Sequence, residues 1–187
     1  MPDGGEYLIR RADASDAGGL SRLAAATFPL ACPPDIALSD LDDFIGDNLS
    51  PASFTHMLQD SGRTILAASD GDAMIGYSVL NFAESKDQRV HTALTIHPSA
   101  EINKFFVSSE HHGHGVAALL MAATLNEASA RGVHGVWLGV SAANSRANAF
   151  YRRHSFSVVG TKSFTLGTRV LPNDIVRERL LQQTNSF

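Results

Sequence analysis

Clustered positive charge and cysteine are both scarce in this sequence. No basic cluster is longer than a pair such as Arg152-Arg153, and the formal net charge is -4. Nucleic-acid binding depends on clustered Lys and Arg that neutralise phosphates, so we expect no nucleic-acid partner. The single cysteine, Cys32, excludes an internal disulfide. This agrees with a reducing cytoplasm, which is the compartment we expect.

Long apolar runs are missing as well. No segment approaches the ~18 apolar residues of a membrane-spanning helix, so we expect no membrane partner. Residues 1–6 (MPDGGE) contain neither the basic nor the apolar region of a secretory signal. Apolar residues make up 44% and charged residues 18% of the 187 positions, which is typical of a globular protein. This length suits one domain, which we expect to span residues 1–187 with a core over about 7–180.

The order of apolar periodicities predicts an α/β (α+β) domain. Strand-like segments occur at 7–10, 64–69, 74–82, 89–96, 101–107 and 135–140, and further strands are expected after Phe156. Helical spacing occurs several times between the first two strands, again from Val116 to a stop at Arg131-Gly132, and over 145–153.

A glycine-rich turn connects strand 101–107 to the helix that begins near Val116. It contains the residues EHHGHG, numbered 110–115. A strand that ends in bare backbone at a helix N-terminus leaves amide N–H groups free at the positive end of the helix dipole. Such an arrangement binds phosphate, although a glycine-rich turn without any ligand is the simpler alternative.

Two phosphate-binding patterns fit this turn. The first is G-x-G-x-x-A, formed by Gly113, Gly115 and Ala118, which is a dinucleotide fingerprint. That fingerprint needs an acidic residue about twenty positions later for the ribose. No acidic residue occurs between Glu127 and Asp174, which weakens the prediction of a nicotinamide-dependent oxidoreductase.

The second pattern is R/Q-x-x-G-x-G/A over residues 112–117, in which His112 replaces the usual Arg or Gln. Residues 144–156 (NSRANAFYRRHSF) fit the block N-x-x-A-x-x-[LF]-Y-x-x-x-G-F, with Ser155 in place of its glycine. The two motifs are in the right order and are separated by one strand. The sequence thus resembles the GNAT superfamily of N-acetyltransferases from Ile9 to Leu180.

This resemblance implies a fold and a co-substrate. The expected fold has a mixed, mostly antiparallel central sheet flanked by helices, with a splayed strand pair that holds the acyl-CoA. The co-substrate is acetyl-CoA, and no metal is implied. By resemblance, the residues that bind it are Phe105, Phe106, Val107, His112, Gly113, His114, Gly115, Val116, Ala117, Ala118, Asn144 and Tyr151.

The resemblance also assigns two groups that move protons. An attacking amine with a pKa near ~10 must lose a proton, and a thiolate leaving group with a pKa near ~8.5 must gain one. Tyr151 stands where the family has its general acid; the alternative is an aromatic ring packed beside Phe150. Glu101 stands where many relatives have the base; an ordinary strand-end carboxylate is the equally weighted alternative.

The sequence says less about the amine that accepts the acetyl group than about the co-substrate. Gly139 replaces the glutamate of ribosomal-protein N-terminal acetylases, which argues against an N-terminal alanine. Segments 44–50, 137–140, 144–156 and 163–175 most resemble bacterial spermine/spermidine (polyamine) N-acetyltransferases. The acidic side chains of Asp35, Asp40, Asp42, Asp43 and Asp47 would suit a polycation, although a solvated helix face is the simpler explanation. A homodimer is common among such relatives.

Two other interpretations stay open. Glu110 and the histidines at 111, 112 and 114 resemble metal ligands. Ligands this close in sequence cannot easily converge while the same backbone holds a phosphate, so we do not expect a metal site. A non-catalytic acyl-CoA-binding or sensor domain would also retain both motifs.

Overall fold

The computed structural model describes residues 7–167 and 169–181, without the side chains of residues 169 and 172–175. Its strands are β1 (Leu8–Arg11), β2 (Arg63–Asp70), β3 (Ala73–Asn81), β4 (Ser99–Val107), β5 (Gly135–Ser141), β6 (Ser157–Leu166) and β7 (Arg169–Leu180). Its α-helices are α1 (Ala17–Thr27), α2 (Leu38–Asn48), α3 (Pro51–Gln59), α4 (Gln88–Ala93), α5 (Val116–Ala130) and α6 (Ser145–Arg153).

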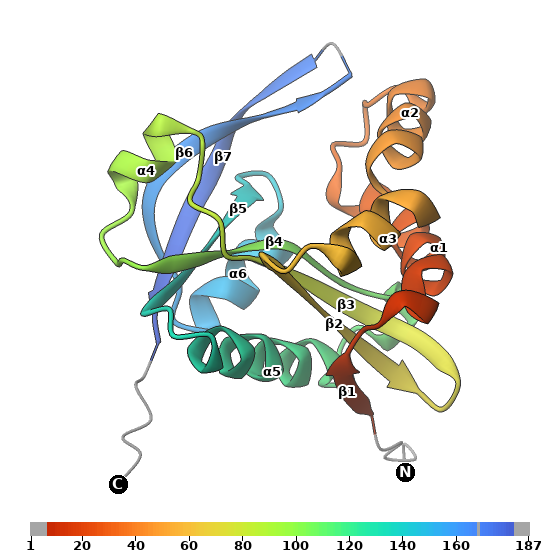
Figure 1. Cartoon of the computed structure of the whole chain (residues 1–187). Helices are drawn as coiled ribbons and strands as arrows, with labels where there is room; N and C mark the ends of the chain where they lie inside the picture. The colour runs from red at the N-terminus through yellow and green to blue at the C-terminus, as the bar shows by residue number, and fades with distance from the viewer. Residues whose placement is uncertain (1–6, 168, 182–187) are drawn as a thin grey trace, which may run out of the picture.

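The strands form one sheet in the order β1-β2-β3-β4-β5-β7-β6 (Figure 1). Every neighbouring pair is antiparallel except β4 and β5, which run parallel. That parallel pairing covers only three positions, from Ser99 opposite Gly135 to Glu101 opposite Trp137. Beyond Glu101 the two strands separate, so the predicted mixed, mostly antiparallel sheet with a splayed pair is confirmed.

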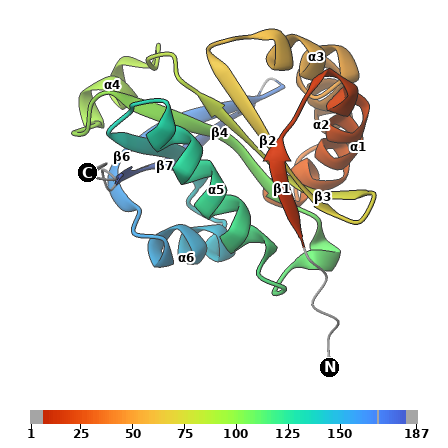
Figure 2. The ribbon, with the colours of Figure 1, turned by 60° about the horizontal axis from the view of Figure 1, so that its bottom comes forward.

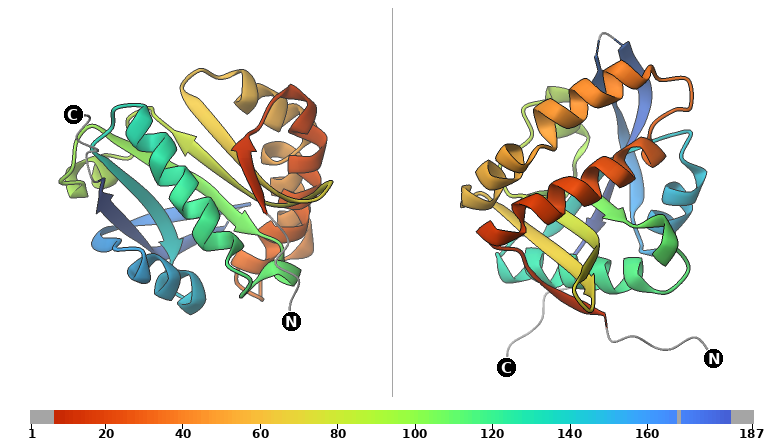
Figure 3. Two further views of the ribbon diagram at one scale, coloured as in Figure 1. Left: turned by 90° about the horizontal axis from the view of Figure 1, so that it is seen from below. Right: turned by 90° about the vertical axis from the view of Figure 1, so that its right-hand side faces the viewer.

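Helices cover both faces of the sheet because side chains alternate along each strand. On β2, Ile65 packs with the helices α1 and α3, whereas its neighbour Leu66 packs with α5 on the other face. Figure 2 shows α5 crossing one face, and Figure 3 shows α1 and α2 lying on the other. In α5, Val116, Leu120 and Met121 are fully buried against the strands.

One predicted strand is wrong. Residues 89–96 form the short helix α4 and a following loop instead of a strand. The Asp87 side chain accepts a hydrogen bond from the Arg89 amide and starts the helix. Val90 and Leu94, four residues apart, both face Trp137 in a small apolar cluster. The i, i+4 spacing of these two residues fits one face of a helix. The sequence prediction failed because a short apolar run alone does not distinguish a helix from a strand.

Because two tyrosines are buried, we expect the protein to lose stability at alkaline pH. Tyr77 is fully buried and its hydroxyl has no hydrogen-bond partner in the described structure, and Tyr151 is 8% exposed. Burial raises the pKa of both phenols above their ordinary value, so the folded chain holds these protons more tightly than the unfolded chain. Their contribution to stability is therefore complete below the ordinary tyrosine pKa of about 10 and is lost as pH rises above it.

We expect each tyrosine to lower the free energy of unfolding by up to about 1.4 kcal/mol per pH unit above pH 10. Urea unfolding at several pH values between 8 and 11 measures this slope. The variant Tyr77→Phe should lose the part of the slope that Tyr77 contributes, while Tyr151 still contributes its own part. An unchanged slope in Tyr77→Phe would contradict the assignment.

Candidate active site

A cavity of about 350 Å³ opens where β4 and β5 separate. Its walls come from β4, the glycine-rich turn, the start of α5, the end of β5 and α6, and Thr27, Leu30 and Ala31 at or just after the end of α1 also contribute. The lining residues include Ile102, Asn103, Lys104, Phe105, Phe106, Val107, His111, His112, Gly113, Gly115, Ala117, Gly139, Val140, Ser141, Asn144, Arg146, Ala147, Phe150, Tyr151 and Arg153. Nine of the twelve predicted cofactor-binding residues are among them.

The three other predicted residues do not line the cavity, and the structure shows why for each of them. The Val116 side chain is fully buried in the core beside Leu120. His114 has an exposed side chain, and its amide donates to the His111 carbonyl (3.4 Å). The amide of Ala118 donates to the Gly115 carbonyl (3.0 Å), so it is already paired within the first helical turn. The prediction that Ala118 offers a free amide is therefore wrong.

The glycine-rich turn nevertheless presents a set of free amides. The N–H groups of Gly113, Gly115, Val116 and Ala117 have no acceptor among the described residues. Gly113 and Gly115 both have φ of +84°, and a Cβ atom at either would meet nothing within 4 Å. Backbone N–H groups at the start of a helix, with open space above them, fit an anionic group such as a pyrophosphate.

A cationic side chain that the sequence analysis overlooked lies beside this turn. The Arg146 guanidinium donates to His112 Nδ1 (2.7 Å), and His112 Nε2 donates to the Val107 carbonyl (3.0 Å). His112 thus ties the end of β4 to α6, while Arg146 brings positive charge to the turn. Arg153 also lines the cavity, whereas Arg152 does not. Arg146 could have been noticed inside the motif of residues 144–156, but its neighbour His112 is 34 residues away.

Tyr151 lines the first cavity from α6. Its ring contacts Phe105, Phe150 and Phe156, and its side chain is almost fully buried. Burial raises the pKa of the phenol, so it keeps its proton at neutral pH. The helix that carries Tyr151 is followed by Ser155, whose φ of 64° is in the left-handed region. This explains why a glycine is usual at that position.

A second cavity of about 170 Å³ lies next to the first. Its lining residues are Phe28, Phe44, Leu49, Glu101, Ile102, Asn103, Lys104, Phe106, Gly139, Lys162 and Phe164. Residues 102–104, Phe106 and Gly139 line both cavities, which therefore meet at the splayed strands. Asn103 is an extra residue in β4, because Val79 pairs with Lys104 and Leu80 with Ile102.

Glu101, the predicted base, faces this second cavity and not the first. It is partly buried at the last position where β4 pairs with β5. Asn81 Nδ2 donates to its carboxylate at 3.5 Å, which is the limit of a hydrogen bond. The two predicted catalytic residues thus lie in adjoining cavities.

The sequence of the chain agrees with this geometry. Residues 32–156 match the acetyltransferase (GNAT) family. The chain belongs to the GNAT family. An uncharacterized N-acetyltransferase of Mycobacterium tuberculosis is 38% identical over 167 residues, which are 89% of this chain and 99% of that protein. An uncharacterized N-acetyltransferase of Mycobacterium bovis has the same identity and coverage.

Solved structures of GNAT enzymes share the fold. The PaiA N-acetyltransferase from Thermoplasma acidophilum, solved in complex with coenzyme A, superimposes with a TM-score of 0.74 at 16% identity, covering 94% of this chain and 99% of that one. The ribosomal-protein-S18-alanine N-acetyltransferase from Escherichia coli gives a TM-score of 0.65 at 14% identity, covering 96% and 97%. The protein is therefore an N-acetyltransferase, and GNAT enzymes use acetyl-CoA.

In this GNAT chain, a buried polar network holds the turn between β5 and α6. Asn148 donates from Nδ2 to the carbonyls of Ser141 (2.8 Å) and Asn144 (2.9 Å). Its Oδ1 accepts from Nε (3.2 Å) and Nη2 (3.1 Å) of Arg177. Arg177 is 6% exposed, and burial lowers the pKa of its guanidinium. The network fixes Asn144, whose Oδ1 caps α6 by accepting from the Ala147 amide (3.0 Å).

We expect Asn148→Ala to lower the free energy of unfolding by about 2–4 kcal/mol, because it leaves the buried Arg177 guanidinium without its main acceptor. Urea unfolding measures the loss. The double variant Asn148→Ala/Arg177→Met should recover part of it, since no unpaired cation then remains in the core. A double variant no more stable than the single one would show that the guanidinium is not the source of the loss.

Metal-binding clusters and membrane-spanning helices are both absent from the described residues. Within the ranges described, no three His, Cys, Asp or Glu side chains are grouped so that they could hold a metal ion. No helix in the same part of the chain has the length and hydropathy of a membrane span.

Proposed function

We propose that the chain transfers the acetyl group of acetyl-CoA to the primary amine of a small molecule, which enters through the second cavity. The observation that carries this proposal is the junction of the two cavities where β4 and β5 separate. A co-substrate along one side of β4 and an amine on the other would meet at Phe106 and Gly139. Such a meeting favours direct attack, because both reactants are held at one point.

Two residues carry the protons in this proposal. Glu101 accepts a proton from the amine, directly or through water, so that the nitrogen lone pair is free to attack. Tyr151 donates its proton to the departing sulfur, since its phenol is still protonated at neutral pH. Acetyl-CoA supplies the acetyl group as a thioester. The location of Glu101 and Tyr151 on the two sides of the junction supports this division of roles.

The remaining cofactor-binding roles are part of the same proposal. The free amides of Gly113, Gly115, Val116 and Ala117 hold the pyrophosphate, and the Arg146 guanidinium adds positive charge beside them. Phe105, Phe106 and Val107 line the path of the pantetheine arm. Asn144 donates to that arm from its Nδ2, because its Oδ1 is already occupied by the helix cap.

A thiol-release assay with acetyl-CoA and a panel of amines tests the proposed function. The panel contains spermidine, apolar amino acids, their decarboxylated analogues and peptides with free N-termini. Turnover of a small amine supports the proposal. Coenzyme A binding in calorimetry without release of thiol for any amine would favour a non-catalytic domain of the same fold.

A polyamine remains a candidate acceptor on sequence resemblance. The five aspartates between residues 35 and 47 are outside the described lining of both cavities, so the structure adds no support from them. Part of that resemblance, the side chains of Asp174 and Ile175, lies outside the described residues. The cytoplasm, a homodimer and the extent of the single domain likewise remain predictions.

A further inference from the structure

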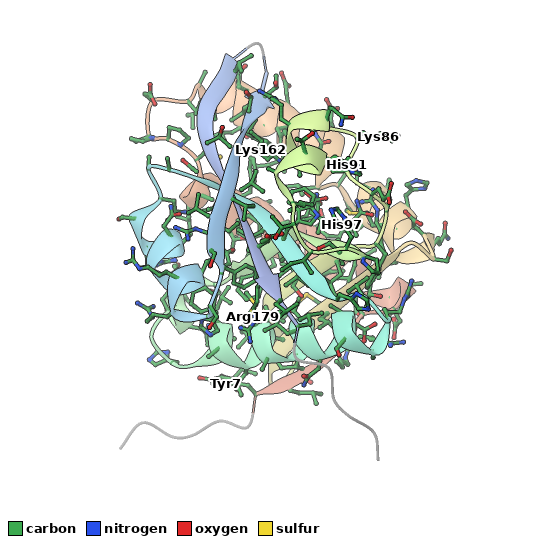
Figure 4. All side chains as sticks on the ribbon, turned by 90° about the vertical axis from the view of Figure 1, so that its left-hand side faces the viewer. Tyr7, Lys86, His91, His97, Lys162 and Arg179 are labelled. Carbon is green, nitrogen blue, oxygen red and sulfur yellow. The ribbon has the colours of Figure 1, made fainter. Side chains whose placement is uncertain are left out.

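The lysines of this chain are concentrated in one place. The sequence has only three lysines, and two of them, Lys104 and Lys162, line the second cavity. The third, Lys86, is exposed beside α4 and outside the lining of both cavities (Figure 4). Lysine side chains are costly to desolvate, so two of three in one cavity call for an explanation.

Lys104 is the better defined of the two. It is partly buried on β4, and among the described residues its ammonium donates only to the neighbouring Asn103 side chain (3.0 Å). No carboxylate of the described structure lies within 4.0 Å of it. Burial lowers the pKa of Lys104, and the negative charge of Glu101 only partly opposes this effect. An anionic group of a ligand at this position would stabilise the ammonium.

Lys162 approaches the same cavity from β6. Its ammonium lies 5.6 Å from the centre of the Trp137 ring, and its alkyl chain fills the space above Gly139. Asp174 is opposite Lys162 in the register of β6 and β7, and the side chain of Asp174 is not described. We therefore base the substrate class on Lys104.

The rest of the lining is one carboxylate and a large apolar surface. Glu101 precedes Lys104 by three residues on the same strand, so the cavity offers a negative and a positive group close together. Phe28, Phe44, Leu49, Phe106 and Phe164 form most of the remaining walls. A polycation could pair with Glu101 but would be repelled by Lys104. A zwitterion would place its ammonium toward Glu101 and its carboxylate toward Lys104.

We propose that the acceptor is a primary amine that also carries a carboxylate and an apolar body, of the chemical class of apolar amino acids. This inference rests on the proposed function and names the substrate class of the same site. The carboxylate binds to Lys104, the apolar body packs against the phenylalanines, and Glu101 receives the proton that the amine loses.

Matched acceptor pairs test this inference. Phenylalanine and 2-phenylethylamine, or leucine and 3-methylbutylamine, differ only in the carboxylate. The wild-type kcat/KM for each amino acid should exceed that for its amine by at least about tenfold, the effect of one charge-assisted hydrogen bond. In Lys104→Met this preference should fall by a similar factor, and because it is a ratio within one acceptor pair, any change common to both acceptors cancels.

Three controls make the result specific. The amine of an amino acid is less basic than that of the matched plain amine, and this alone can change the ratio of their kcat/KM values. That part of the preference does not depend on Lys104, so it remains in Lys104→Met. Lys104→Arg should retain most of the preference, since it keeps the charge. Lys86→Met should match the wild type, and calorimetry with coenzyme A checks that Lys104→Met still binds the co-substrate.

The outcomes separate the inference from the proposed function. Equal turnover within each pair, an unchanged preference in Lys104→Met, or turnover of spermidine alone would overturn the inference and leave the proposed function standing. Failure to acetylate any amine of the panel would overturn both. Preference for the amino acids that is lost in Lys104→Met supports the inference.

Discussion

Replacing Tyr151 by phenylalanine should lower kcat by about 10²–10⁴-fold at neutral pH, the range expected for loss of a general acid. The ring would still pack against Phe105, Phe150 and Phe156, so the fold and the affinity for coenzyme A should change little. Only the proton for the departing sulfur is removed. Steady-state thiol release with a saturating amine measures kcat, and calorimetry measures the binding of coenzyme A.

Tyr77→Phe is the matched control for this experiment. Tyr77 is also buried, and its hydroxyl has no partner within the described ranges, but it lines neither cavity. Its replacement should leave kcat unchanged and stability at neutral pH unchanged or slightly higher, because an unsatisfied buried hydroxyl is removed. If Tyr151→Phe retained full activity beside this control, the assignment of the general acid would be wrong.

Replacing Gly115 by alanine should raise the dissociation constant for coenzyme A by about 10- to 100-fold, the equivalent of one or two charge-assisted hydrogen bonds. At φ of +84° an alanine is strained, and its methyl group would occupy the open space above the free amides. A pyrophosphate could then no longer approach those amides. Calorimetry with coenzyme A measures the change.

Gly132→Ala separates this effect from backbone strain. Gly132 has φ of +79°, also has nothing within 4 Å of an added Cβ, and lines neither cavity. Both variants should lose about 1–2 kcal/mol of stability from the left-handed backbone conformation. Only Gly115→Ala should lose affinity. An equal loss of affinity in both variants would mean that the turn at Gly115 does not hold the co-substrate.

Local sequence patterns were sufficient to predict much of the fold. The helix 145–153 and the strands predicted at 64–69 and 74–82 occur where the sequence predicts them. The glycine-rich turn has the free amides that its composition implies, apart from those of His114 and Ala118. The error at residues 89–96 has the same local origin, because the short apolar spacing of Val90 and Leu94 fits two conformations and the cap at Asp87 decides between them.

The sequence by itself determined the family, the order of most elements and the glycine-rich turn between β4 and α5. These features depend on spacing within about twenty residues or on motifs whose order is visible. Only the tertiary structure placed Arg146 on His112, Arg177 on Asn148, and Lys104 and Lys162 in one cavity with Glu101. These neighbours come from different elements. Their proximity depends on strand register and on the divergence of β4 from β5, which no local pattern specifies.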